Sequence, residues 1–311
     1  MASLALRNRT WLHKSGDWVL TAATGLATLL VLCIVGVILG DIGLHGWQRI
    51  SWAFISSAPT EGMTEGGIFP AIYGTCALVI LMALAVVPLG VVTALYLHEY
   101  ADPRALTTRL VRIAVYNLAG VPSIVFGLFG LGFFVQFVGA GIDKVIYAGE
   151  KVYGQPALIW AALTLAALTL PVVIVATEEA LRAVPQELRQ ASAALGATRL
   201  QTVLYMVLPQ SLAGVLTGTI LAVSRGAGEV APILFTGAAY FLPHLPTSPH
   251  DQFMELGYHV YILATQSPDV DATKPMLYST VLVLLALTFL LNGAAVVIRA
   301  RLRRRSLGGR S

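Results

Sequence analysis

Charged residues are scarce in this chain. Asp, Glu, Lys and Arg make up only 12% of its 311 residues, whereas 57% of the residues are hydrophobic. Soluble domains carry about a quarter charged residues, so this chain has too little polar surface to cover a globule in water. The composition excludes an ordinary soluble domain and predicts a protein that exposes much of its surface to lipid.

Cysteines and the common catalytic motifs are also missing or rare. The two cysteines, Cys33 and Cys76, have no CxxC neighbour, which argues against a disulfide framework or a cysteine metal site. None of the four lysines follows a glycine, so no phosphate-binding loop of the GxxxxGK type is present. The pair His98-Glu99 lacks the second histidine of HExxH. We therefore expect no ATPase site, no metal and no other cofactor in this chain.

Two weaker patterns do not indicate a site. Residues 226–231 read GAGEVA and mimic a dinucleotide-binding turn, but they lie in an apolar stretch with no strand before them. One polar connection holds three histidines together with Asp251 at spacings that fit no zinc pattern, and we expect the histidines to be solvated: His244, His250 and His259.

Six long apolar stretches dominate what is present. A bilayer core of about 30 Å needs about 20 apolar residues as helix, and each stretch is long enough. The sequence therefore predicts an all-α, polytopic membrane protein with about six transmembrane helices. The first stretch follows a basic start but is too long for a cleaved signal peptide, so we expect a retained anchor. The predicted spans are Trp18–Gly40, Phe69–Leu97, Ile113–Val138, Ala157–Thr177, Ser211–Phe235 and Met276–Ile298.

Small residues and prolines recur within these spans. Gly36 and Gly40 form one GxxxG pair, and Gly214 and Gly218 form another. Small residues allow close helix packing, whereas interrupted helices are also typical of cavities and pathways. Both interpretations stay open at this point.

The distribution of Lys and Arg predicts the orientation. Fifteen of the 20 Lys and Arg lie in the two terminal segments and in the connections 98–112 and 178–210, whereas four lie in the other connections. Because positive charge stays on the cytoplasmic side, both termini are predicted to be cytoplasmic. The basic tail 299–311 is then a topology signal, and we expect no nucleic-acid partner.

The connection 178–210 predicts a pair of short cytoplasmic helices. Pro185 suits the first turn of a helix, and Gly196 suits the left-handed residue that ends one. We expect a second helix from about Thr198 to Pro209. The alanines of the first helix leave a small-sided surface that a partner could approach closely, although a simple interfacial helix pair is an alternative.

This connection resembles the EAA loop of binding-protein-dependent ABC importer permeases, E-A-A-x(3)-G-x(9)-I-x-L-P. Gln190 departs from the family's Glu, while Glu187 lies one turn earlier. The resemblance implies a type I ABC importer (MetI-like) permease fold, in which this loop forms coupling helices that bind a cytoplasmic ATPase. The matching positions are Gln190, Ala191, Ser192, Gly196, Met206, Leu208 and Pro209.

Three further stretches, residues 65–75, 120–130 and 225–236, resemble the permeases of phosphate-specific importers, and the last resembles the A-type subunit. Val230 stands where that family usually has Thr. The resemblance covers about residues 65–298, preceded by a segment 1–64 with its own span and outer loop. It implies a subunit of the bacterial inner membrane that forms half of a pathway for inorganic phosphate. The implied partners are a C-type permease, an ATPase dimer that binds ATP, and an extracytoplasmic phosphate-binding protein.

Arg225 and Glu229 are the clearest charges inside a predicted span. At positions i and i+4 they are expected on one helix face, and intramembrane charges usually face a cavity or a partner. The pair either locks the bundle or lines a pathway in which Arg225 meets an anion. Three other functions stay open: an importer of sulfate, molybdate or tungstate, an intramembrane enzyme, and a signalling subunit that reports phosphate status.

Overall fold

The computed structural model describes residues 2–60, 65–267 and 269–308, and for residues 2–16, 298 and 302–308 it describes the backbone alone. Most of the predicted basic tail, and residues 61–64 of the first segment, therefore lie outside the described side chains. Six helical stretches in the described part are long and apolar enough to cross a membrane, which confirms the predicted all-α, six-span architecture. They run over Asp17–Arg49, Phe69–Tyr100, Ser123–Ile146, Leu158–Arg182, Arg199–Gly226 and Val270–Arg301.

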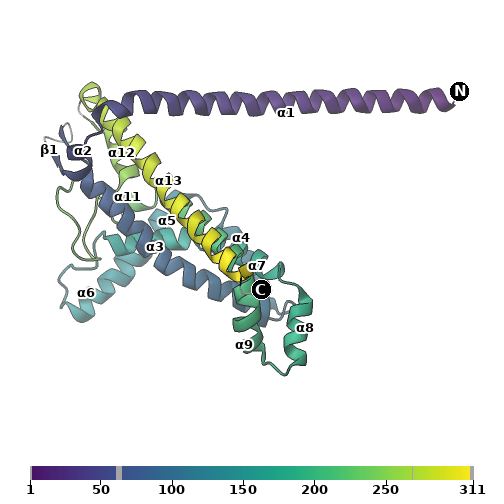
Figure 1. Ribbon diagram of the computed structural model, residues 1–311. Coiled ribbons are helices and arrows are strands. Elements are labelled where there is room, and N and C mark those ends of the chain that lie inside the picture. Colours follow the sequence, from purple (N-terminus) through teal and green to yellow (C-terminus); the bar gives the residue numbers. More distant parts are fainter. Residues whose placement is uncertain (1, 61–64, 268, 309–311) are drawn as a thin grey trace.

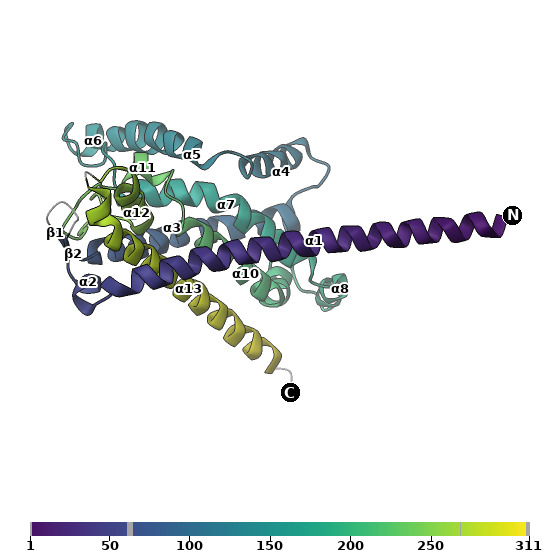
Figure 2. The same ribbon diagram turned by 90° about the horizontal axis from the view of Figure 1, so that it is seen from above.

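The first helix, α1 (Ala2–Gly46), projects away from the rest of the chain, and its N-terminus lies far from every other element (Figures 1 and 2). It touches the bundle at its C-terminal end, where Tyr278 Oη donates a hydrogen bond to Asp41 at 2.9 Å. Beside it, Ser279 Oγ donates to the Gly46 carbonyl at 2.7 Å. Both contacts come from the last helix, α13 (Val270–Gly308).

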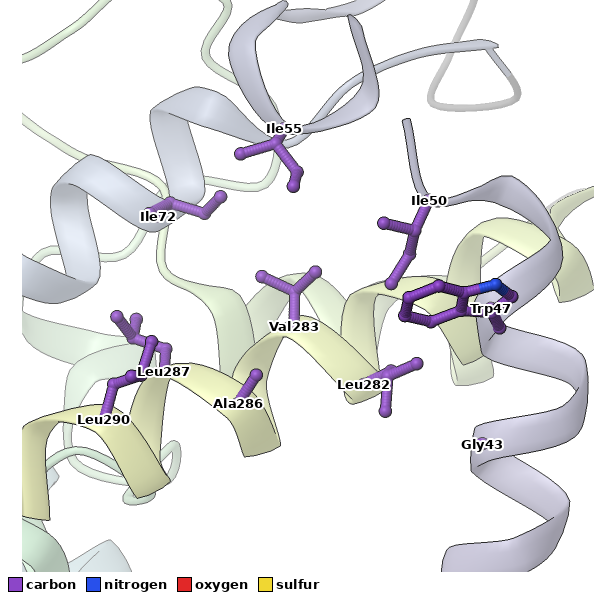
Figure 3. A pocket seen from close by; sticks show the side chains of 10 residues that line it. All are labelled: Gly43, Trp47, Ile50, Ile55, Ile72, Leu282, Val283, Ala286, Leu287 and Leu290. Carbon is purple, nitrogen blue, oxygen red and sulfur yellow. The ribbon is translucent and has the colours of Figure 1, made fainter. Parts of the chain in front are cut away.

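Short elements follow α1 at this end of the bundle. They are the 3₁₀ turn η1 (Trp47–Arg49), α2 (Trp52–Ser56), and a small hairpin of β1 (Pro59–Thr60) and β2 (Glu65–Gly66). A cavity of about 530 Å³ lies between this segment, α3 and α13. Figure 3 shows that Trp47, Val283 and Leu287 are among its lining residues. The lining is apolar, as expected for a surface that meets hydrocarbon.

Three helices form the core: α3 (Phe69–Leu95), α7 (Leu158–Arg182) and α10 (Leu208–Gly226). Small residues let them approach closely, because a Cβ at Gly214 or Gly218 would lie 2.4 Å from the Cβ of Ala180 or Ala176 on α7. This GxxxG pair therefore packs as expected from the sequence. Gly36 and Gly40 have no neighbour within 4 Å, so their pair makes no such contact within the described chain.

The predicted third span, Ile113–Val138, is wrong at its start. Residues Leu106–Leu118 form a separate helix, α4, with Arg109 and Arg112 among its polar residues. The chain then breaks at Gly120, and α5 (Ser123–Phe129) begins after Pro122. Proline disfavours helical geometry in the residue before it, so the membrane helix starts only at Ser123. It continues through the π-helical segment η4 (Gly130–Gly139) into α6 (Ala140–Ile146).

The fifth span differs from its prediction, Ser211–Phe235, at both ends. It begins at α9 (Arg199–Thr202) and passes through the π-helical turn η5 (Val203–Val207) into α10. The sequence predicted that the second helix of the connection 178–210 ends at Pro209. This prediction is wrong, because the π turn displaces the carbonyls that the proline ring would otherwise meet. At its other end α10 stops at Gly226, and α11 (Ile233–Thr236) follows as a separate short helix.

The connection before α13 contains the short helix α12 (Leu256–Thr265). His259 on this helix is buried, so the expectation that it is solvated is wrong. Burial lowers the pKa of His259 to about 4. His244 is exposed as expected. Within the described residues, no group of three or more His, Cys, Asp or Glu side chains could hold a metal ion.

Glu255 caps the N-terminus of α12. Its carboxylate accepts hydrogen bonds from the backbone N–H groups of Gly257 and Tyr258, at 2.9 and 2.7 Å, and Thr75 Oγ1 on α3 lies 3.4 Å away. The side chain is buried, and burial raises the pKa of Glu255 to about 7 despite these donors. The cap therefore holds α12 against α3 through a carboxyl group that changes charge near neutral pH.

We expect Glu255→Gln to change how stability depends on pH. Because the pKa is raised from 4.5 to about 7, protonated Glu255 stabilises the fold fully below about pH 4.5, and this contribution is lost as pH rises through 7. Thermal unfolding of the detergent-solubilised protein should show that the stability of the variant increases relative to that of the wild type as pH rises between these values. Exposed Glu150→Gln is the control, and a pH-independent difference for Glu255→Gln would contradict the assignment.

Candidate functional site

The predicted charged pair lies where α10 ends. Arg225 belongs to the last turn of the helix, and Glu229 follows three residues after Gly226. The expectation that both lie on one helix face is wrong, since the chain leaves the helix between them. They still pair, with Arg225 Nε 3.3 Å from Glu229 Oε1, because the turn keeps the i to i+4 separation short. Arg225 Nε is the guanidinium nitrogen that makes this contact.

The exposure of the two side chains distinguishes this pair from a buried salt bridge that only holds the helix bundle together. The Arg225 side chain is 41% exposed and the Glu229 side chain 21% exposed. Within the described residues, the two terminal nitrogens of Arg225 make no hydrogen bond. A guanidinium offers two parallel donors that match two oxygens of an oxyanion. The arrangement can therefore bind an anion while Glu229 limits how tightly it is held.

The backbone beneath Arg225 is fixed by close packing. A Cβ at Gly226 would lie 2.3 Å from Sδ of Met82 on α3, so only glycine fits there without displacing Met82. The turn closes with hydrogen bonds from the N–H of Gly228 to the Arg225 carbonyl and from the N–H of Glu229 to the Gly226 carbonyl. Arg225 thus extends from a rigid point of contact between α10 and α3.

The predicted coupling loop forms two helices, α8 (Gln186–Ala194) and α9, at the end of the bundle opposite the β hairpin (Figures 1 and 2). The expected boundaries are confirmed: α8 begins after Pro185, and Gly196 has φ of +80°. Thr198 begins α9 with a capping box, in which it exchanges hydrogen bonds with Gln201. Local sequence signals therefore determine this part of the structure.

The predicted loop residues divide into three sets. Exposed positions, which a partner could reach, are Glu187, Gln190, Ala191 and Gly196. Ser192 points inward, and its Oγ lies 2.9 Å from Thr202 Oγ1 on α9. Leu208 and Pro209 lie apart from this surface, at the start of α10. Leu195 is 89% exposed beside Gly196, and no sequence pattern had singled it out.

The structure does not bring the charged pair and the loop together. They lie at opposite ends of α10, whose 19 residues span about 28 Å at about 1.5 Å per residue. Two further carboxylates that the sequence had not indicated, Glu99 and Glu178, are buried near the loop and each pairs with an arginine. Only their place at the ends of apolar stretches could have indicated them.

The fold and these two sites define a class of membrane transport subunit. Residues 86–304 match the family described as "Binding-protein-dependent transport system inner membrane component". The chain belongs to this family and is a multi-pass protein of the inner membrane, with the fold of an ABC importer permease.

The similar proteins with names are permease subunits of ABC transporters. The chain is 32% identical over 273 residues to the probable ABC transporter permease protein YqgI of Bacillus subtilis, a match that covers 84% of this chain and 88% of the relative. It is 34% identical over 219 residues to the phosphate transport system permease protein PstA 1 of Mycobacterium tuberculosis, covering 68% of this chain and 67% of that protein. The expected resemblance to phosphate permeases of the A type is confirmed.

A solved structure supports the fold. A chain of the bacterial alginate ABC transporter, solved with a periplasmic protein bound to an alginate pentasaccharide, superposes with a TM-score of 0.62 at 18% identity. The match covers 93% of this chain and 98% of the other. At this identity the likeness concerns the fold, and it confirms the ABC importer architecture expected from the sequence.

Gly196→Ala tests whether the left-handed residue holds the loop. No atom lies within 4 Å of the added Cβ, so the cost comes from φ of +80° alone, and we expect a loss of about 1–2 kcal/mol in local stability. Hydrogen exchange of the amides of α8 and α9 should become faster by about tenfold. Gly141→Ala, which also meets open space but at an ordinary φ, should leave these rates unchanged. Equal exchange in both variants would refute the role of Gly196.

Proposed function

We propose that this chain is the A-type permease subunit of an ATP-driven importer and forms half of a transmembrane pathway for inorganic phosphate. The observation on which the proposal rests is the partly exposed Arg225, whose guanidinium pairs with Glu229 through Nε and keeps its terminal donors available. Relatives named as phosphate transport permeases support the choice of anion.

The chemistry of the pair suits passage of an anion. Phosphate presents several oxygens at the spacing of the two terminal guanidinium nitrogens. Glu229 repels the same anion and competes for Arg225, which keeps residence short. A permease that held phosphate tightly would release it slowly, and capture belongs to the extracytoplasmic binding protein implied by the family description.

The importer needs partners that supply energy and complete the pathway. A second permease of the C type forms the other half, and a relative with that name is 30% identical to this chain over 236 residues. A cytoplasmic ATPase dimer binds ATP and contacts the exposed face of α8 and the turn at Gly196. This chain itself supplies no cofactor and no ATPase site.

Arg225→Gln should lower phosphate uptake by about tenfold or more, because charge-assisted hydrogen bonds contribute about 1.5–3 kcal/mol each. The measurement is uptake of radiolabelled phosphate in cells that lack this chain and are complemented with wild type or variant. Arg104→Gln, in an exposed connection, is the matched control and should transport normally. Gly196→Asp should abolish uptake, because it alters the loop that is proposed to contact the ATPase.

Competing anions separate phosphate from other substrates. Excess unlabelled sulfate or molybdate should leave phosphate uptake unchanged. Uptake that these anions suppress would assign the pathway to another oxyanion, with the importer class retained. Intact uptake in cells without the chain, combined with altered expression of phosphate-regulated genes, would instead favour a signalling subunit.

A further inference from the structure

The attachment of α8 to the membrane helices depends on few side chains. Leu188 lies in a small apolar cluster with Leu95, Leu181, Val184 and Val207, and Ser192 contacts Thr202 on α9. The apolar contacts of Leu188 are non-directional, so they let a helix slide, and the Ser192 hydrogen bond joins α8 only to the neighbouring α9. The remaining inward side chain of α8, Arg189, makes the directional contacts.

Arg189 joins α8 to two core helices at once. Its Nη2 donates to Oε1 of Glu99 at 3.0 Å and to the Leu181 carbonyl at 2.9 Å, and its Nη1 donates to the Val184 carbonyl at 2.6 Å. The Arg189 and Glu99 side chains are only 14% and 10% exposed. A planar fork with three acceptors fixes position and angle together.

Two of the three acceptors belong to the ends of α3 and α7, and the third, the Val184 carbonyl, lies in the connection between α7 and α8. Glu99 lies in the π-helical turn η3 (Tyr96–Tyr100), which extends α3. Leu181 belongs to the last turn of α7, and its carbonyl accepts from Arg189 Nη2 as well as from the backbone N–H of Val184 at 3.3 Å. A cation at this end is also favoured by the helix dipole. Removing Arg189 would leave the buried Glu99 carboxylate and the Val184 carbonyl without this donor.

The same two core helices reach the charged pair at the other end. Met82 on α3 fills the space at Gly226, and Thr169 on α7 lies 3.9 Å from the position of a Gly226 Cβ. Met82 and Thr169 thus bring both core helices against the turn that carries Arg225, and we expect movement of α3 or α7 to reach that turn through these contacts. A continuous path of contacts therefore leads from α8 through Arg189 to the anion site.

A second arginine provides a comparison. Arg112 on α4 donates to Oε2 of Glu178 at 3.0 Å and to the Leu97 carbonyl at 2.9 Å. The chemistry is the same and the core helices are the same, but α4 is not part of the predicted coupling loop. Beside Arg189, by contrast, a cavity of about 300 Å³ leaves room for α8 to move.

We propose that Arg189, through Glu99 and the Leu181 carbonyl, is the positioning residue that transmits movement of α8 to α3 and α7. The inference rests on the proposed contact between α8 and an ATPase, and it does not depend on phosphate being the substrate. Without Arg189, α8 stays joined to α7 through residues 183–185 and the Leu188 cluster, but its movement no longer reaches α3 through a directional contact.

The test uses Leu221→Cys as a reporter in a chain that also carries Cys33→Ala and Cys76→Ala. Leu221 is 55% exposed and lies one turn before Arg225 on α10. The complex assembled with its ATPase is labelled with an impermeant maleimide, with and without ATP and vanadate. In the otherwise wild-type chain, trapping ATP should change the labelling rate by about fivefold or more. The change should disappear in Arg189→Gln, return in part in Arg189→Lys, and persist in Arg112→Gln.

Each outcome decides the inference. Co-purification of the ATPase shows which variants assemble. Should Arg189→Gln fail to assemble, Glu99→Gln keeps the size of the side chain and should reduce the ATP-dependent change by about threefold. An assembled Arg189→Gln or Glu99→Gln complex with the full change would overturn the role of Arg189. If the reporter chain itself shows no change, the proposed ATPase contact fails and the transmission role falls with it, whichever anion is carried.

Discussion

Close contact between α3, α7 and α10 is the constraint on which the rest of the structure depends. In lipid no hydrophobic force brings helices together, so dispersion contacts between small residues must do so. Gly90 on α3 is one such point, where an added Cβ would lie 2.6 Å from the Val173 side chain on α7. Buried threonines on α7 fit this environment because Thr164 and Thr169 donate to their own helix carbonyls at 2.7 and 2.8 Å.

This core makes the two functional regions interdependent. The turn that presents Arg225 is held by Met82 on α3, and the loop helix α8 is held by the ends of α3 and α7 through Arg189. The charged pairs at the two regions differ in how far they are buried. The Arg189–Glu99 pair is nearly buried, and both terminal nitrogens of Arg189 donate within the chain, whereas Arg225 stays 41% exposed. Exposure therefore separates a pair that positions helices from a pair that can meet a ligand.

The sequence predicted the features that depend on local chemistry. Long apolar runs indicated six spans, and Pro185 and Gly196 indicated the boundaries of α8 correctly. Helix ends inside apolar stretches were not predictable in this way. Hydropathy is continuous across Pro122 and across Gly226, so the break before α5 and the end of α10 were missed.

Contacts between distant residues lay beyond the sequence altogether. Arg189 and Glu99 are 90 positions apart, and neither belongs to a pattern that indicates a partner. Within the candidate site, the pairing of Arg225 with Glu229 was expected, but its place in a turn after α10 was not. Tertiary packing determined the turn after α10, because Gly226, which permits the close approach of Met82, has no side chain to indicate a neighbour.

We propose, above all, that this chain couples ATP hydrolysis by its partner ATPase to the passage of phosphate. The direct measurement is simultaneous phosphate uptake and ATP hydrolysis in proteoliposomes that contain the chain with the second permease and the ATPase. Phosphate-loaded binding protein should stimulate hydrolysis and produce accumulation of phosphate inside the vesicles, and both should vanish without ATP. A rate of hydrolysis that the loaded binding protein does not change, together with no phosphate accumulation in a correctly assembled complex, would contradict this proposal.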